Sequence, residues 1–169
     1  MALSKQAIEP YVSQLYTIRE DAAYSAQSYF EAAKSAEFWG RAIVFVPALL
    51  GAIAGIIVAL GGTREWGAVG AVVGAVAATA SFLGSDRKSG SFKDSARQFT
   101  KLRHRAAMEI KLAARKATES ELEGTLRSLR RDYDSVVNAS DPVPNRAFTK
   151  AKRRINAGVL ECDLDSTTS

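Results

Sequence analysis

Hydrophobic positions along the chain fall into two patterns, the first of which is a pair of continuous apolar stretches. These stretches, 41–62 and 66–85, contain no charged residue after Arg41. A helix of about 20 residues is roughly 30 Å long, which is the thickness of the hydrocarbon core of a bilayer. Only three residues, 63–65, separate the stretches, so helices here must fold back on each other. The pattern predicts an all-α protein built on an antiparallel two-helix transmembrane hairpin.

The second pattern flanks the hairpin, where apolar residues recur at steps of three or four, as is typical of amphipathic helices. One such helix is predicted over 8–40 and is expected to continue unbroken into the first span. A short basic helix is predicted over 146–157, and a disordered tail over 163–169. We interpret residues 1–162 as one two-transmembrane helical domain with long cytoplasmic helices before and after the hairpin.

Between the second span and the basic helix, the same periodicity covers residues 91–138. Ser91 and Asp94 have the spacing of a capping box and predict a helix start. Thr118 and Glu121 have the same spacing, so a second helix is an alternative to one continuous helix. Periodicity alone leaves both arrangements open.

Small residues recur at four-residue spacing in both spans, which allows two helix backbones to approach closely. The candidates for helix packing or oligomerisation are Gly51, Gly55, Gly67, Gly70, Gly74 and Ala78. The spacing fits packing within the hairpin as well as packing between subunits of a homo-oligomer. The second span is the less apolar of the two, and Ala71, Ala75 and Thr79 are candidates for lining a pore. The alternative is that this face packs on the first span.

Lys and Arg residues near the spans predict the orientation. Nine of them flank the hairpin within 20 residues, whereas the turn contains only Arg64. The positive-inside rule therefore predicts a multi-pass protein of the inner (cytoplasmic) membrane with both termini in the cytoplasm. The predicted interface anchors are Trp39, Arg41, Trp66, Arg87 and Lys88, and the predicted basic cytoplasmic face contains Lys101, Arg103 and Arg105. We interpret that face as solvated and close to anionic lipid, with no nucleic acid expected.

Candidate chemistry is sparse. His104 is the only histidine and lies among like charges, and Cys162 is the only cysteine. These two cannot furnish a zinc site unless subunits share ligands, and the glycines of the spans lack the Lys-Ser/Thr that a phosphate-binding loop needs. We therefore predict no catalytic residue, no metal, no cofactor and no enzymatic activity. A soluble protein with both apolar stretches buried as core helices is the alternative to a membrane protein.

The layout resembles the bacterial SLATT family, two-transmembrane effectors that associate with nucleotide-synthesising and nucleotide-sensing partners. The resemblance covers about residues 8–158. It rests on Phe38-Trp39-Gly-Arg41 before a first span with Pro47, a Gly/Ala-rich second span, Phe92 and Phe99 early in a long cytoplasmic helix, and a Pro142-Val-Pro144 break. It implies an oligomeric pore-forming effector of an anti-phage or conflict system that kills or arrests the cell. The chain has no sensing domain, so the resemblance implies a separate sensor or nucleotide-signalling protein. The alternative function is a non-conducting membrane scaffold that recruits a cytoplasmic partner.

Overall fold

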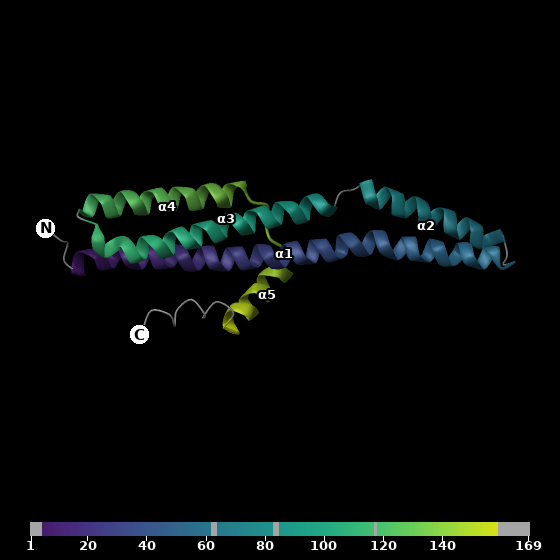
Figure 1. Ribbon diagram of the computed structural model, residues 1–169, viewed down its shortest axis with the longest axis horizontal. Coiled ribbons are helices and arrows are strands. Elements are labelled where there is room, and N and C mark those ends of the chain that lie inside the picture. The colour runs from purple at the N-terminus through teal and green to yellow at the C-terminus, as the bar shows by residue number, and fades with distance from the viewer. Residues whose placement is uncertain (1–4, 62–63, 83–84, 117, 159–169) are drawn as a thin grey trace. The chain divides into compact units, whose positions relative to one another are not determined.

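A computed structural model describes residues 5–61, 64–82, 85–116 and 118–158, and these are helical apart from short connections. The predicted all-helical class is confirmed, with no strand among the residues described. The helices, in order, are α1 (Lys5–Ala59), α2 (Arg64–Phe82), α3 (Ser85–Leu112), the short 3₁₀ helix η1 (Ala113–Arg115), α4 (Glu119–Ala139) and α5 (Asn145–Asn156) (Figure 1).

Helix α1 joins the N-terminal arm and the first apolar stretch into one helix of 55 residues. The sequence contains no Gly or Pro between Tyr11 and Trp39 that would end it. The helix continues through Gly40 and through Pro47, which lies inside the apolar stretch. The segment before the first apolar stretch is therefore covalently and helically continuous with it.

The chain divides into two compact units. The first contains residues 1–32 and 91–169, and the second contains residues 33–90. Each unit takes part of α1 and part of α3, so the region interpreted from sequence as one domain corresponds to two units. They are described separately below.

The first unit is a helical bundle in which the first half of α1 lies beside α3, and α3 lies beside α4 (Figure 1). Its centre is aromatic: the ring of Phe99 stacks on Tyr29 at 5.4 Å between centroids and meets Tyr133 edge-on at 5.8 Å. Such pairs stabilise a core beyond the burial of their area. The buried side chains around them include Leu15, Ile18, Ala22, Ala26, Phe92, Ala96, Leu102, Ala106, Leu122 and Leu129.

The second unit contains the apolar part of α1 packed against α2. A Cβ placed on Gly70 would lie 3.6 Å from the Cβ of Ala54, and one on Gly51 would lie 3.9 Å from Val73. Residue numbers that rise along α1 meet numbers that fall along α2, so the two helices pack antiparallel. Ala54 is buried at this contact, because the opposing glycine leaves room for close approach.

The connections between the later helices decide between the alternatives that the sequence left open. Residues 91–138 form two helices, with Thr118 as the N-cap of α4, its hydroxyl accepting a bond from the backbone N–H of Glu121. The prediction that Ser91 begins a helix is wrong, because α3 begins at Ser85. The Ser91 hydroxyl instead donates to the Asp141 carboxylate at 2.9 Å, which ties α3 to the α4–α5 connection.

Candidate functional site

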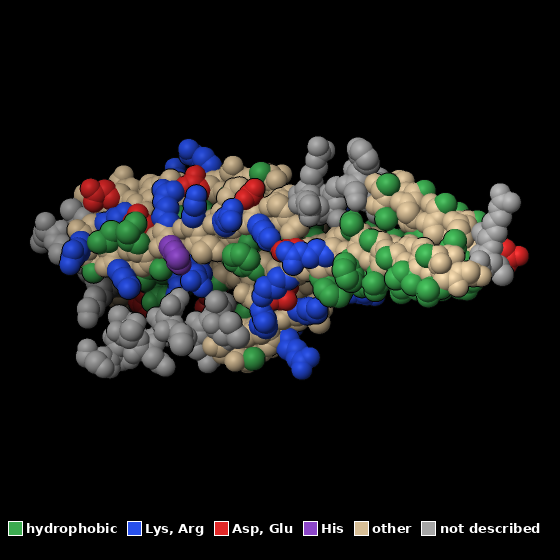
Figure 2. Space-filling model, turned by 45° about the vertical axis from the view of Figure 1, so that its right-hand side comes forward, with side chains coloured by type: hydrophobic (Ala, Val, Ile, Leu, Met, Phe, Trp, Pro, Cys, Tyr) green, Lys and Arg blue, Asp and Glu red, His purple; other side chains and the backbone are tan. Residues whose placement is uncertain are grey.

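The most prominent functional feature is a large apolar surface on α1 that nothing in the described chain covers. Of the most apolar 18-residue window of this helix, only 6% is buried, at a mean hydropathy of 2.6. By length and composition α1 is able to cross a membrane. Figure 2 shows hydrophobic side chains gathered over this part of the molecule and Lys and Arg over the bundle. The large exposed side chains are Ile43, Val44, Phe45, Val46, Leu49, Leu50, Ile53, Ile56, Val58 and Leu60.

Helix α2 differs from α1 in length. It has 19 residues, close to the roughly 20 that a perpendicular span requires, and the apolar stretch found among its described residues is Glu65–Thr79. The predicted second span also extends past the end of the helix, because Ser85 belongs to α3. Among the described helices only α1 meets the length and composition of a span, so the second span stays a prediction.

The small residues of the two helices separate into two groups. Gly51, Gly67 and Gly70 lie in the α1–α2 contact, where an added Cβ would meet a side chain of the other helix within 4.0 Å. Gly55 and Gly74 face open space, with nothing within 4 Å of an added Cβ. Spacing alone did not distinguish these groups, whereas the structure assigns only the first to packing within the chain. Ala78, the last of the predicted set, is exposed.

The three candidate pore-lining residues are exposed on α2. The hydroxyl of Thr79 donates to the backbone oxygen of Ala75 at 2.9 Å, so its polarity is satisfied by its own helix. Such a bond lets a threonine face lipid or another helix at low cost. Ala71 and Ala75 have no bulk to fill the space beside them. The face is therefore open in the single chain and small enough to meet another helix closely.

The predicted interface anchors are exposed where the structure describes them. Trp39 and Trp66 are about half exposed, and Trp39 packs edge-on against Phe38. Arg41 forms an ion pair with Glu37 one turn earlier. Lys88 is exposed, whereas the side chain of Arg87 lies outside the described residues.

The predicted basic face of α3 has mixed roles. Lys101 is exposed, and a guanidinium nitrogen of Arg103 lies 3.2 Å from the ring Nε2 of His104. Arg105 forms an ion pair with Asp132 and a bond to the hydroxyl of Ser128, both on α4. One of the three predicted cations therefore holds two helices of the bundle together.

Sequence reasoning missed a clasp that fixes α5 against α1. The ring of Phe148 meets Tyr24 edge-on at 4.7 Å, and Arg154 donates to the Glu31 carboxylate at 2.7 Å. Ala147 and Ala151, one turn apart on α5, are buried. Because the partners are more than 120 residues apart, no local pattern signals the pairing. The one available signal was the four-residue spacing of the two alanines in an otherwise basic helix.

A bond from the Tyr29 hydroxyl to the backbone oxygen of Asp141 at 2.8 Å holds the start of the α4–α5 connection. Tyr29 is buried, and this burial raises the pKa of its hydroxyl above the usual value. At the far end of the bundle, the Tyr11 hydroxyl donates to Glu119 at 2.9 Å, and that carboxylate raises the pKa of Tyr11. The two tyrosines tie α1 to the start of α4 and to its end.

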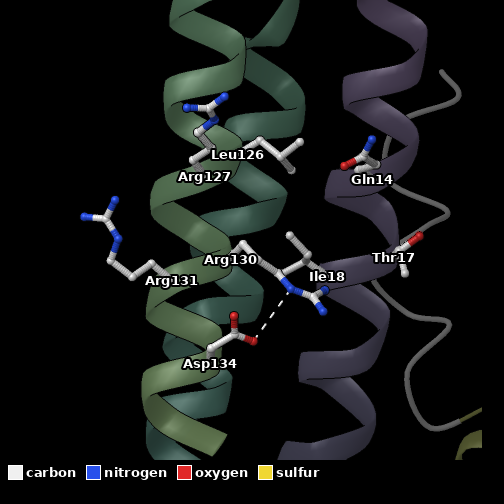
Figure 3. A pocket seen from close by; sticks show the side chains of 8 residues that line it. All are labelled: Gln14, Thr17, Ile18, Leu126, Arg127, Arg130, Arg131 and Asp134. Carbon is white, nitrogen blue, oxygen red and sulfur yellow. Dashed lines mark ion pairs between the residues drawn. The ribbon is translucent and has the colours of Figure 1, made fainter.

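A groove of about 600 Å³ runs between α1 and α4. Figure 3 shows Ile18 and Leu126 in the space between the helices and Arg130 reaching across toward α1, while Arg131 points away. Arg130 is paired with Asp134 at 3.6 Å. The remaining lining residues are Gln14, Thr17 and Arg127, so the groove combines an apolar floor with a largely basic wall on α4.

No group of three or more His, Cys, Asp or Glu side chains within the described ranges is placed to hold a metal ion. The buried Glu31 forms an ion pair with Arg154, and the half-buried Glu109 lies 2.9 Å from the Lys116 ammonium. The residues predicted for packing and pore lining thus lie on α1 and α2, and the predicted basic face lies on α3 of the bundle.

Comparison of the chain with protein-family models, with curated proteins and with solved structures finds no match.

Proposed function

We propose that the chain is an oligomeric pore-forming effector of the bacterial inner membrane, with an antiparallel transmembrane hairpin of α1 and α2 and both termini in the cytoplasm. The single observation that carries the proposal is the uncovered apolar surface of α1. Contiguous exposed apolar area of this extent marks a membrane or protein interaction site. In this proposal, lipid covers the apolar surface along most of α1, and other copies of the chain pack against the face that carries small residues.

The split between the glycines supports assembly. Gly51 and Gly70 are used inside the chain, whereas Gly55 and Gly74 are open. Close packing through small residues is a principal way in which helices associate in lipid, where apolar burial gives no driving force. Contacts through Gly74 bring α2 of neighbouring copies together and place the face of Ala71, Ala75 and Thr79 at the centre of the assembly.

The helical bundle supplies the regulatory end of this proposal. Helix α1 runs from the bundle into the apolar stretch without a break. A separate partner, in the proposal a nucleotide-sensing or nucleotide-producing protein of an anti-phage system, rearranges the bundle. The rearrangement reaches the membrane through α1, and the opened pore depolarises, arrests or kills the cell.

The test is membrane potential in bacteria that express the chain under an inducible promoter, alone and with the neighbouring genes of its source genome. A potential-sensitive dye reports depolarisation within minutes of activation if the chain forms a pore. Unchanged potential in cells that contain membrane-inserted protein and an active partner would contradict the pore.

Two variants separate assembly from insertion. Gly74→Leu fills the open face of α2 and is expected to abolish depolarisation while leaving the amount of protein in the membrane unchanged. Lys101→Gln, on an exposed position of the bundle, is the matched control and keeps depolarisation intact. Loss of activity in both variants would show that Gly74 has no specific role.

A second candidate function is a non-conducting membrane scaffold that recruits a cytoplasmic partner, and the groove between α1 and α4 favours it. A mixed apolar and basic groove of this size suits a segment of another protein. The scaffold predicts that Gly74→Leu preserves function and that Leu126→Arg, in the groove, abolishes it. The pore predicts that Gly74→Leu abolishes function.

A further inference from the structure

Positive charge per residue in the bundle is highest on α5. This helix of 12 residues carries five Lys or Arg and no acidic residue. Helix α4, of 21 residues, carries three arginines against five carboxylates. The difference in net charge between α5 and α4 shows that basic residues are not spread evenly over the bundle. The charge of α5 therefore needs an explanation specific to this helix.

The clasp fixes which side of α5 faces outward. Ala147 and Ala151 are buried, and Phe148 rests against Tyr24. Arg146, Lys150 and Arg153 follow one another at spacings of four and three, which places them in one row, roughly 110° around the helix from the alanines. All three are exposed.

The row lacks counter-charges within the molecule. Arg154, on the flank of α5, is paired with Glu31. In the part of the chain that the structure describes, Arg146, Lys150 and Arg153 form no ion pair and no side-chain hydrogen bond. Three cations one helical turn apart repel one another, which costs stability unless an external anion compensates.

We propose that the outer row of α5 binds the phosphate headgroups of anionic lipids in the membrane that α1 enters. The inference rests on the proposed membrane location, though not on the pore. Glu31, the anchor of α5, precedes the uncharged stretch that begins at Ala42 by 11 residues. Even fully extended, that much chain spans at most about 40 Å, so the covalent chain keeps the anchor of α5 within that reach of the apolar stretch. A juxtamembrane basic segment is attracted to anionic lipid there.

The test uses the full chain in a mild non-ionic detergent, titrated with water-soluble dioctanoyl-phosphatidylglycerol or dioctanoyl-phosphatidylcholine and followed by thermophoresis. We expect binding of the anionic phosphatidylglycerol only, because phosphatidylcholine has no net charge. Each Lys or Arg at a membrane surface contributes about fivefold, so the triple variant Arg146→Gln/Lys150→Gln/Arg153→Gln is expected to bind about a hundredfold more weakly. The triple variant Arg127→Gln/Arg130→Gln/Arg131→Gln on α4 removes the same charge and is expected to change affinity less than about threefold, since its arginines lie off the row.

Other outcomes overturn the proposal. Equal binding of both lipids, or equal weakening by both triple variants, would show a detergent-like or a net-charge effect instead. Inorganic phosphate that displaces the lipid at millimolar concentration would show a free-phosphate site. Tighter binding of a short single-stranded DNA would assign the row to nucleic acid. Because the three side chains are exposed, circular dichroism is expected to show unchanged helix content in the variant, and a loss of helix would itself contradict the outward placement of the row. Failure of lipid binding leaves the depolarisation test of the pore unaffected, so the two proposals are tested separately.

Discussion

The two compact units of the molecule differ in how they bury their apolar side chains. In the bundle, long-range contacts such as Tyr29 with Phe99 and Glu31 with Arg154 complete the core within the chain. In the second unit, α1 and α2 share a narrow contact of small residues and leave their large aliphatic side chains exposed. The bundle buries its apolar side chains among its own helices, whereas the second unit leaves most of its large apolar side chains uncovered. The contrast teaches that contacts within the chain account for the packing of the bundle, whereas the second unit depends on its surroundings to cover its apolar side chains.

The largest effect is expected in the core of the bundle. Leu129→Ala removes a side chain that is fully buried on α4, and we expect the free energy of unfolding of the bundle to fall by about 2–5 kcal/mol. Thermal unfolding followed by circular dichroism measures it. Val137→Ala, on an exposed position of the same helix, is the control and should change stability by less than about 0.5 kcal/mol. Similar losses in both variants would mean that α4 is not packed as described.

A charge on the apolar surface tests the other side of the comparison. Ile56 is 59% exposed on α1, and Met108 is 55% exposed on the bundle. An arginine near the centre of a span costs about 3 kcal/mol, so Ile56→Arg is expected to reduce the membrane-bound fraction strongly. Met108→Arg exposes its charge to water and is expected to leave that fraction unchanged. Equal behaviour of the two variants in a membrane fractionation would remove the distinction between the surfaces.

The glycines offer a finer test within the second unit. Gly70→Leu places bulk against Ala54 and is expected to destabilise the α1–α2 contact by about 1–3 kcal/mol. Gly74→Leu, one turn later, meets open space and should leave that contact intact. Disulfide formation between cysteines introduced at Gly51 and Val73, in a background with Cys162→Ser, reports the contact. Equal disulfide yields in the two variants would show that Gly70 does not face α1.

The smallest predicted effect concerns a single hydrogen bond. Tyr29→Phe keeps the ring stack with Phe99 but removes the bond to Asp141, and we expect a loss of about 1 kcal/mol. Tyr16→Phe, at an exposed ring, is the control. Thermal unfolding of the two variants side by side measures the difference, and a loss in the control as large as in Tyr29→Phe would contradict the assignment.

The same tyrosine predicts an alkaline limit of stability. Because burial raises its pKa above the unfolded value near 10.0, the neutral hydroxyl contributes stability that is fully present below pH 10. That contribution is lost as the pH rises through the higher folded-state value. We expect the unfolding temperature of the bundle to fall above pH 10 less steeply in Tyr29→Phe than in the parent chain. An identical slope in both would show that Tyr29 does not titrate with unfolding.

Much of the fold was predictable because helices are signalled by residues that are close together in the sequence. The helical periodicity indicated the helices of the bundle, the continuous apolar stretches indicated α2 and the second half of α1, and the Thr118–Glu121 spacing located the start of α4. The start of α3 was mistaken because a serine followed by an acidic residue three positions later also occurs inside helices. There the Ser91 hydroxyl bonds a distant carboxylate in place of a backbone N–H.

The candidate surfaces were only partly predictable. Glycine spacing identified the residues able to pack, but Gly70 and Gly74 share one helix face, so which of them meets α1 depends on where along their length the two helices diverge. The clasp of α5 depends on side chains more than 120 positions apart, which one sequence cannot pair. The assembly and its conduction depend on contacts between copies, so they stay proposals.

The central claim is that the apolar surface of α1 is solvated by lipid. Its most direct test is flotation of bacterial membranes on a sucrose gradient after an alkaline carbonate wash, with the chain expressed at a low level. We predict that the chain floats with the lipid and leaves it only in detergent. Recovery of the chain in the carbonate supernatant as a monomer that stays in solution without detergent would contradict the claim.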